Sequence, residues 1–118
     1  MISLDRDGDV WILRMAAGEN RFNLEWLDAV NTALDEVTAA DSPAALVSTG
    51  EGKFYTNGLD LDWLASYPDA GAFLTGVNQL NARLLTLPLR LVGISVAAVF
   101  ALLTALLFLP ARALGQHR

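Results

Sequence analysis

The stretch LVSTGEGKFYTNGLDLDWL, residues 46–64, is the part of this 118-residue chain that best indicates its fold. A short apolar strand leads into a glycine-bearing turn, and Gly58 then comes two residues before Asp60, a good N-cap for the helix behind it. The N–H groups of Leu59 and its neighbours have no acceptor within that helix and lie at the positive end of its dipole. This arrangement favours a partial negative charge, such as a carboxylate, a phosphate or a developing oxyanion.

The spacing of these residues also fits a simpler interpretation, in which a capped helix follows a turn in an ordinary α/β domain. The glycines do not form a phosphate-binding loop. The segment from Gly50 to Phe54 lacks the four-residue gap before the second glycine and the Ser or Thr after Lys53.

The residue types are more specific than the spacing. Residues 49–61, TGEGKFYTNGLDL, resemble the first signature of the crotonase superfamily, the enoyl-CoA hydratases and isomerases, which reads G-x-G-x-x-F-x-x-G-x-D-L. The resemblance implies a protein that binds acyl-CoA thioesters, with two backbone N–H groups holding the thioester oxygen as it becomes an enolate. The first of these donors follows the signature glycine, so the resemblance assigns Leu59, after Gly58, to the oxyanion hole. The pair Asn57-Gly58 is more similar to the isomerase branch, and Asn57 counts among the candidate CoA-binding residues.

The chain before this stretch predicts a β-hairpin and a helix. Residues 2–5 alternate between apolar and polar side chains, as in a strand. Asp7-Gly8 is a turn signal, and the mainly apolar residues 10–15 predict a second strand. Asn23 can cap a helix whose apolar positions recur at helical spacing; these are Leu24, Leu27, Val30, Leu34 and Val37. A helix, a strand and a second helix in this order favour a parallel βαβ arrangement.

The loop before that helix carries the remaining candidate ligand contacts. The resemblance places residues 20–23 where the family's backbone meets the adenosine end of CoA, which implies contacts at Arg21 and Phe22. The Arg21 side chain is also within reach of a CoA phosphate in this interpretation, although an exposed loop arginine is the simpler one. Farther on, residues 72–87 predict an amphipathic helix stopped by Pro88, and the resemblance extends to about that proline.

After Pro88 the family pattern is absent. The glycine-rich turn that supplies the second oxyanion donor has no counterpart, and residues 70–118 contain neither Asp nor Glu for the catalytic acids. We therefore expect an α/β chain with the N-terminal part of a crotonase-like ββα spiral fold over 1–89, truncated or rearranged after about residue 88. Such a chain would bind acyl-CoA but have little enzymatic activity alone.

Residues 91–109, LVGISVAAVFALLTALLFL, carry no charge. As one helix they would span about 28 Å, close to the hydrocarbon thickness of a bilayer. The sequence thus predicts a hydrophobic, transmembrane helix within a second segment, 90–118, and as an alternative function a non-enzymatic, single-pass membrane-tethered α/β domain. The competing interpretation is a buried strand, such as 94–99, followed by a core helix.

Composition narrows the remaining classes of function. The net charge of −5, with all 13 acidic residues between Asp5 and Asp69, argues against nucleic-acid binding. There is no cysteine and the one histidine, His117, is next to the last residue, so we expect neither a metal site nor a histidine-based triad. The acidic N-terminus predicts no signal peptide. We expect no cofactor other than the CoA thioester substrate, a membrane or cytoplasmic location, and homo- or hetero-oligomers with crotonase-like chains as possible assemblies.

Overall fold

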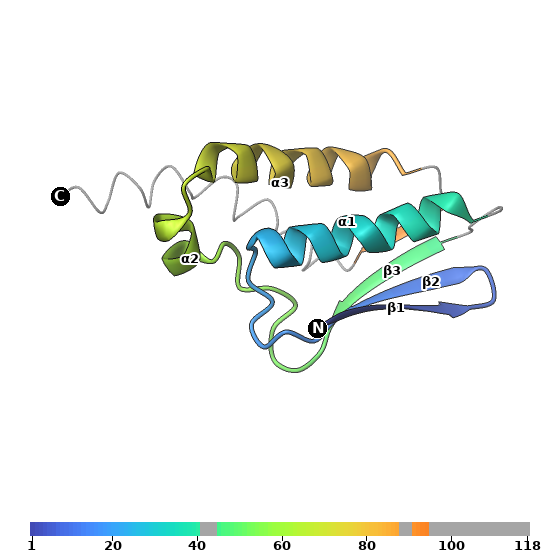
Figure 1. The fold of residues 1–118 in the computed structure, drawn as a ribbon. Helices are drawn as coiled ribbons and strands as arrows, with labels where there is room; N and C mark the ends of the chain where they lie inside the picture. The colour runs from blue at the N-terminus through green and yellow to red at the C-terminus, as the bar shows by residue number, and fades with distance from the viewer. Residues whose placement is uncertain (41–44, 88–90, 95–118) are drawn as a thin grey trace.

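The computed structural model describes residues 1–40, 45–87 and 91–94, and these form one sheet with helices packed on it (Figure 1). The sheet has the strand order β1-β2-β3-β4. β1 and β2 pair antiparallel as the predicted hairpin, whereas β2–β3 and β3–β4 are parallel, as the βαβ prediction requires. The strands are β1 (Ile2–Asp7), β2 (Val10–Met15), β3 (Ala45–Gly50) and β4 (Leu91–Ile94).

Each parallel connection passes through helices that lie on the same side of the sheet (Figure 1). The helix α1 (Leu24–Ala39) connects β2 to β3, and α2 (Leu61–Ser66) and α3 (Ala70–Leu85) connect β3 to β4. An Asn or Asp side chain caps each helix by accepting a backbone N–H of the first turn; the caps are Asn23, Asp60 and Asp69. The caps predicted at Asn23 and Asp60 are thus confirmed.

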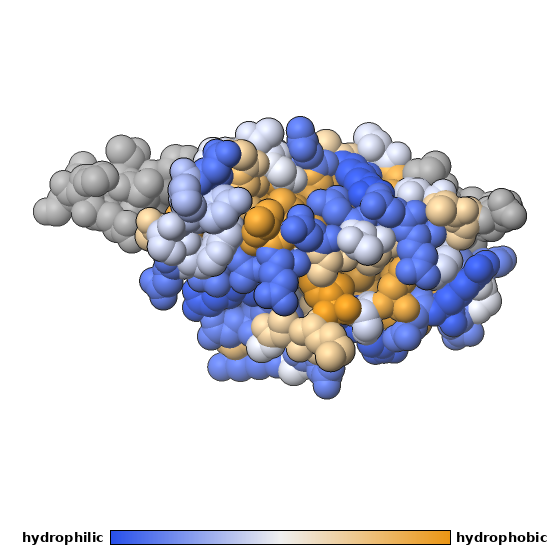
Figure 2. Space-filling view, viewed as in Figure 1, coloured by the Kyte–Doolittle hydropathy of each residue, from blue (hydrophilic) through white to orange (hydrophobic). Residues whose placement is uncertain are grey.

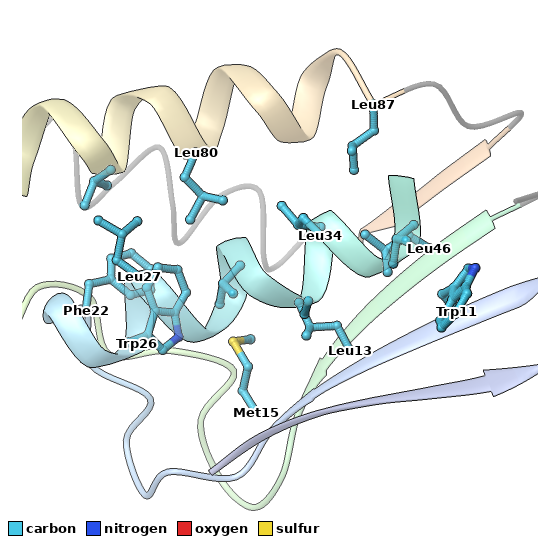
Figure 3. Close-up of a cluster of buried hydrophobic side chains, with 14 of the residues drawn as sticks. Trp11, Leu13, Met15, Phe22, Trp26, Leu27, Leu34, Leu46, Leu80 and Leu87 are labelled. Carbon is cyan, nitrogen blue, oxygen red and sulfur yellow. The ribbon is translucent and has the colours of Figure 1, made fainter. Parts of the chain in front are cut away.

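The core fills the space between the helices and the sheet (Figure 3). Trp11, Leu13 and Met15 alternate along β2 and are all buried, which is the period of a strand with one covered face. From the helices come Leu34 of α1 and Leu80 of α3, each at most 1 % exposed. The side of the molecule seen in Figure 2 is mostly hydrophilic, with apolar side chains in smaller areas between the polar ones.

One predicted core position of α1 is wrong. Leu24 is 36 % exposed, whereas Trp26 and Ala33, which the predicted stripe omitted, are buried. At about 100° per residue, Leu24 lies more than about 100° around the helix from the centre of the buried face, on which Val30 and Val37 lie. The predicted apolar stripe was spaced by steps of three residues at the start of the helix. It therefore departed from the buried face there and wrongly included Leu24.

The predicted helix over 91–109 is corrected at its beginning. Leu91–Ile94 are strand β4, which pairs with β3 in the register Ala45↔Leu91 to Ser48↔Ile94. The rest of that segment, 95–109, lies outside the described residues. None of the helices within the described ranges has the length and hydropathy to cross a membrane. A run of apolar residues without a period is compatible with a buried strand as well as with a helix, and only pairing with β3 distinguishes them.

Candidate functional site

The candidate site lies in residues 50–60, the signature segment, which leads from the end of β3 to the N-cap of α2. The segment turns back tightly on its own start. A Cβ built on Gly50 would lie 2.5 Å from the carbonyl oxygen of Phe54, so no larger residue fits there without moving backbone. Gly52 has φ of 84° and Gly58 has φ of 79°, both in the left-handed region where glycine is favoured. The glycines of the motif are thus explained by one close approach and two backbone conformations.

The Leu59 amide is directed away from the protein segment that holds it. The Phe22 N–H donates to the Gly58 carbonyl oxygen at 2.8 Å. That carbonyl and the Leu59 N–H belong to the same trans peptide unit, in which they point in opposite directions. The Leu59 N–H therefore points away from Phe22, and among the described residues it donates no hydrogen bond.

The next peptide unit is held on the same partner. The Asp60 N–H donates to the Phe22 carbonyl oxygen at 3.0 Å, which makes Phe22 and Leu59 an isolated parallel β-bridge. Phe22 is itself 1 % exposed and stacks on Trp26 with ring centroids 4.0 Å apart. The backbone N–H and C=O of Phe22 are thus both used inside the protein, and a contact of its backbone with CoA stays a prediction.

Asp60 fixes the direction of α2 just after the Leu59 amide. Its Oδ1 accepts the Trp63 N–H at 3.2 Å, and its backbone oxygen accepts the Leu64 N–H at 2.9 Å. The Asp60 carboxylate therefore acts as the predicted cap. Asp62, in the first turn of α2, is exposed.

Arg21 and Asn57, two predicted CoA-binding residues, meet at a residue that the sequence did not single out. The Glu19 Oε2 accepts from Arg21 Nε at 2.5 Å and from Asn57 Nδ2 at 3.1 Å. These two hydrogen bonds hold the pKa of the Glu19 carboxyl below its usual value, the Asn57 bond having the larger effect. Arg21 and Asn57 are exposed, so their role in ligand binding stays a prediction; within the protein they connect the 19–22 loop to the signature segment.

A cleft of about 370 Å³ opens beside this loop, and its walls include both Arg21 and Asp60. Glu19 and Glu25 also line it. Three carboxylates and one guanidinium make this cleft a poor match for several phosphate groups, while leaving Arg21 accessible to one.

Asn20 is the second residue that sequence reasoning missed as a site residue. Its side chain is completely buried, its φ is 51°, and its amide bonds backbone groups of three segments. The available signal was an asparagine in a polar loop, since Asn adopts the left-handed region more readily than most residues. Its bonding partners are up to 35 positions away in the sequence, which no local pattern reveals.

Tyr55 and Ser48 form a polar pair inside an otherwise apolar pocket. Their hydroxyl groups are hydrogen-bonded to each other, and the pocket is lined mainly by core side chains such as Leu13, Met15 and Phe22. Burial raises the pKa of the Tyr55 phenol, and the Ser48 hydrogen bond opposes that rise in part. Among the described residues no group of three or more His, Cys, Asp or Glu side chains could hold a metal ion.

Comparison with known proteins finds relatives that match most of this chain. It is 30 % identical over 93 residues to the peroxisomal enoyl-CoA delta isomerase 1 of Arabidopsis thaliana, a match that covers 75 % of this chain and 39 % of that protein. The chain thus spans about two fifths of the length of this curated relative. No family model matches the sequence.

Solved structures agree with the sequence relatives. A structure of a Mycobacterium tuberculosis enoyl-CoA isomerase superposes with a TM-score of 0.70 at 32 % identity, covering 79 % of this chain and 40 % of that one. A second structure of that same protein, described there as a probable enoyl-CoA hydratase, gives a TM-score of 0.71 at 31 % identity, with the same coverage.

Proposed function

This chain belongs to the crotonase superfamily, and on that premise we propose that it binds acyl-CoA thioesters through the Leu59 amide. The thioester carbonyl oxygen of the ligand would accept the Leu59 N–H. Of the two reaction types in the names of its relatives, we favour the shift of a double bond in an enoyl-CoA, because the curated relatives named 1, 2 and 3 of Arabidopsis thaliana are all enoyl-CoA delta isomerases.

The observation that carries this proposal is the direction of one peptide unit. The Phe22 N–H binds the Gly58 oxygen and so turns the Leu59 N–H away from Phe22, and this N–H meets no acceptor among the described residues. An unpaired backbone donor is costly if it is buried without water, so such a group is expected to meet solvent or a ligand. Its place one residue before the N-cap of α2 adds the positive end of a helix to the same point, although α2 is only 6 residues long.

The chemistry needs a donor at this position because charge moves onto the oxygen during reaction. Removing a proton next to a thioester carbonyl converts the carbonyl into an enolate oxygen with a negative charge. A preorganised N–H gains strength as that charge develops, and losing one such donor typically costs about 2.7–4 kcal/mol of transition-state stabilisation. The Leu59 amide would supply one donor of this kind.

Proton transfer is a separate requirement. The Asp60 carboxylate already accepts the Trp63 N–H, and residues 70–118 contain no Asp or Glu. General acid–base groups typically contribute about 10²–10⁴-fold in rate. We therefore expect this chain by itself to bind and polarise an enoyl-CoA better than it turns it over.

The test removes the Leu59 N–H; the Gly58 carbonyl becomes an ester carbonyl and so also accepts the Phe22 N–H more weakly. Incorporating the α-hydroxy analogue of leucine at position 59 replaces the amide by an ester and keeps the side chain. Crotonyl-CoA labelled with ¹³C at its thioester carbonyl then reports polarisation as a shift of the carbonyl stretch to lower frequency. We expect that shift with the natural chain and its loss with the ester, with affinity lowered by about tenfold or less.

Two controls separate binding from polarisation. Leu59→Ala keeps the N–H and shortens only the side chain, so it should keep the carbonyl shift, provided that circular dichroism shows it folded. Coenzyme A without an acyl group should bind the natural and ester forms equally. The proposal fails if the natural chain does not bind crotonyl-CoA at millimolar concentration, or if the ester form gives the same shift.

A further inference from the structure

The direction of the Leu59 amide depends on how firmly residues 19–22 are tied to the signature segment. The two run side by side and are joined by successive hydrogen bonds. The Asn57 N–H donates to the Glu19 backbone oxygen at 2.8 Å, and the Phe22 N–H donates to the Gly58 oxygen. Asn20 lies between these two bonds in one segment, and Thr56 comes directly before them in the other.

Asn20 ties three pieces of backbone together. Its Nδ2 donates to the carbonyl oxygens of Met15 and Tyr55, each at 3.0 Å, with Phe54 farther away at 3.4 Å. Its Oδ1 accepts the Ala17 N–H at 2.8 Å. Because the side chain is 0 % exposed, water cannot replace these bonds, and no other side chain of this size offers both a donor and an acceptor in this arrangement.

Thr56 continues the connection from Asn20 toward Leu59. Its Oγ1 donates to the Asn20 backbone oxygen at 2.6 Å and accepts the Gly58 N–H at 3.1 Å. Gly58 therefore has its N–H fixed by Thr56 and its carbonyl fixed by Phe22. With both ends of a left-handed glycine held, the peptide unit that carries the Leu59 N–H has little freedom to rotate.

We propose that Asn20 and Thr56 are positioning residues that set the direction of the Leu59 amide toward a bound thioester oxygen. This inference rests on the proposed function. In this proposal neither side chain contacts the ligand, and both act through Gly58. These bonds hold Gly58 at a φ of 79°, and because glycine has no Cβ it would rotate more freely once they are removed. Preorganisation of this kind matters because an oxyanion donor works only when it already points at the oxygen.

Thr56→Val gives the sharper test, since it keeps the shape of the side chain and removes both hydrogen bonds. The readouts are the affinity for ¹³C-labelled crotonyl-CoA and the shift of its bound carbonyl stretch. We expect affinity to fall by less than about tenfold while most of the carbonyl shift is lost. Thr56→Ser, which retains the hydroxyl, should recover the shift.

Asn20→Asp is the second variant, because it keeps size and replaces the donating amide by acceptor oxygens. We expect the same loss of carbonyl shift in whatever fraction folds. Val37→Ala is the matched control for lost stability, since Val37 is completely buried in α1 and bonds to neither segment. It should lower the melting temperature and leave the shift unchanged.

The outcomes separate the two proposals. If the natural chain polarises the carbonyl and Thr56→Val does so equally, the positioning role is wrong and the proposed function stands. If Val37→Ala loses the shift as well, the effect is one of general stability and the positioning role is again wrong. If the natural chain gives no shift at saturating crotonyl-CoA, the proposed function fails and this inference fails with its premise.

Discussion

Tyr55 is a residue with a polar group in the apolar pocket. The signature pattern has a phenylalanine at this place, yet here a phenol reaches into the apolar pocket, where Ser48 is its hydrogen-bond partner. A buried hydroxyl with a partner costs little, whereas the same hydroxyl without one costs about 1–3 kcal/mol. Ser48 and Tyr55 are therefore best regarded as a single unit.

The raised pKa of Tyr55 predicts how stability depends on pH. The folded state holds the phenol proton more tightly than the unfolded state, so this contribution to stability is complete below the ordinary tyrosine pKa of about 10. It is lost as the pH rises above that value toward the raised pKa. Urea denaturation between pH 8 and pH 11 should show a falling free energy of unfolding at the alkaline end.

Tyr55→Phe is the control for this prediction. It removes the titrating group, so its free energy of unfolding should fall less steeply over the same range of pH. Parallel curves for the two proteins would mean that Tyr55 does not contribute to the alkaline loss. Ser48→Ala in addition to Tyr55→Phe avoids leaving the serine hydroxyl without its partner.

At the scale of the helices and strands, the local patterns were sufficient wherever one side of an element is polar. The hairpin, the caps of α1 and α2, and most of the buried face of α1 follow from alternation, helical period and capping residues. The strand β4 did not follow, because an unbroken apolar run looks the same whether it pairs with β3 or forms a helix. Likewise, the Leu59 amide was predicted from its neighbours, but Glu19 and Asn20 act on partners far along the chain.

The contact between α1 and α3 predicts that substitutions on its two sides lower the free energy of unfolding by different amounts. Arg83 of α3 reaches α1, where it bonds the backbone and side-chain oxygens of Asn31 at 3.2 and 3.1 Å and pairs with Asp35 at 2.6 Å. The Asp35 side chain is 73 % exposed, so that ion pair is weak. We expect Arg83→Met to lower the free energy of unfolding by about 1 kcal/mol and Asp35→Ala by less than about 0.5 kcal/mol.

Urea denaturation at low and high salt would measure both. The effect of Arg83→Met should persist at 1 M salt, because most of it comes from the bonds to Asn31. Equal effects of the two substitutions, or an effect of Arg83→Met that salt abolishes, would assign the contact to the ion pair instead.

For the molecule as a whole, α1 and α3 cover one side of the sheet (Figure 1). Its central strands are the most extensively paired. Within the part of the chain that the structure describes, β2 and β3 are each paired on both sides, whereas β1 is paired with β2 alone. Opening of a segment costs least where few bonds and buried contacts hold it. The signature segment is held chiefly by side-chain and isolated backbone bonds to residues 19–22.

Native-state hydrogen exchange should reproduce this order. We expect the amides of β2 and β3 to exchange slowest, those of β1 to be intermediate, and the Leu59 amide to be among the fastest of the described residues, because it has no acceptor there. An excess of crotonyl-CoA should slow Leu59 selectively. Strong protection of Leu59 without ligand would show that it has an acceptor in the protein.

The hydrogen bond from the Phe22 N–H to the Gly58 carbonyl oxygen has one more consequence. The Leu59 N–H that this bond orients belongs to the main chain, so it has no ionisation of its own. Nineteen of the twenty genetically encoded amino acids would present the same N–H at position 59. Because the Leu59 side chain is 8 % exposed within the core, a mutational survey scored by function should tolerate other apolar residues there and reject proline, which has no N–H to offer. Selection for the N–H itself would act through the glycine beside it and the loop opposite, whereas the Leu59 side chain is constrained separately, by its burial in the core.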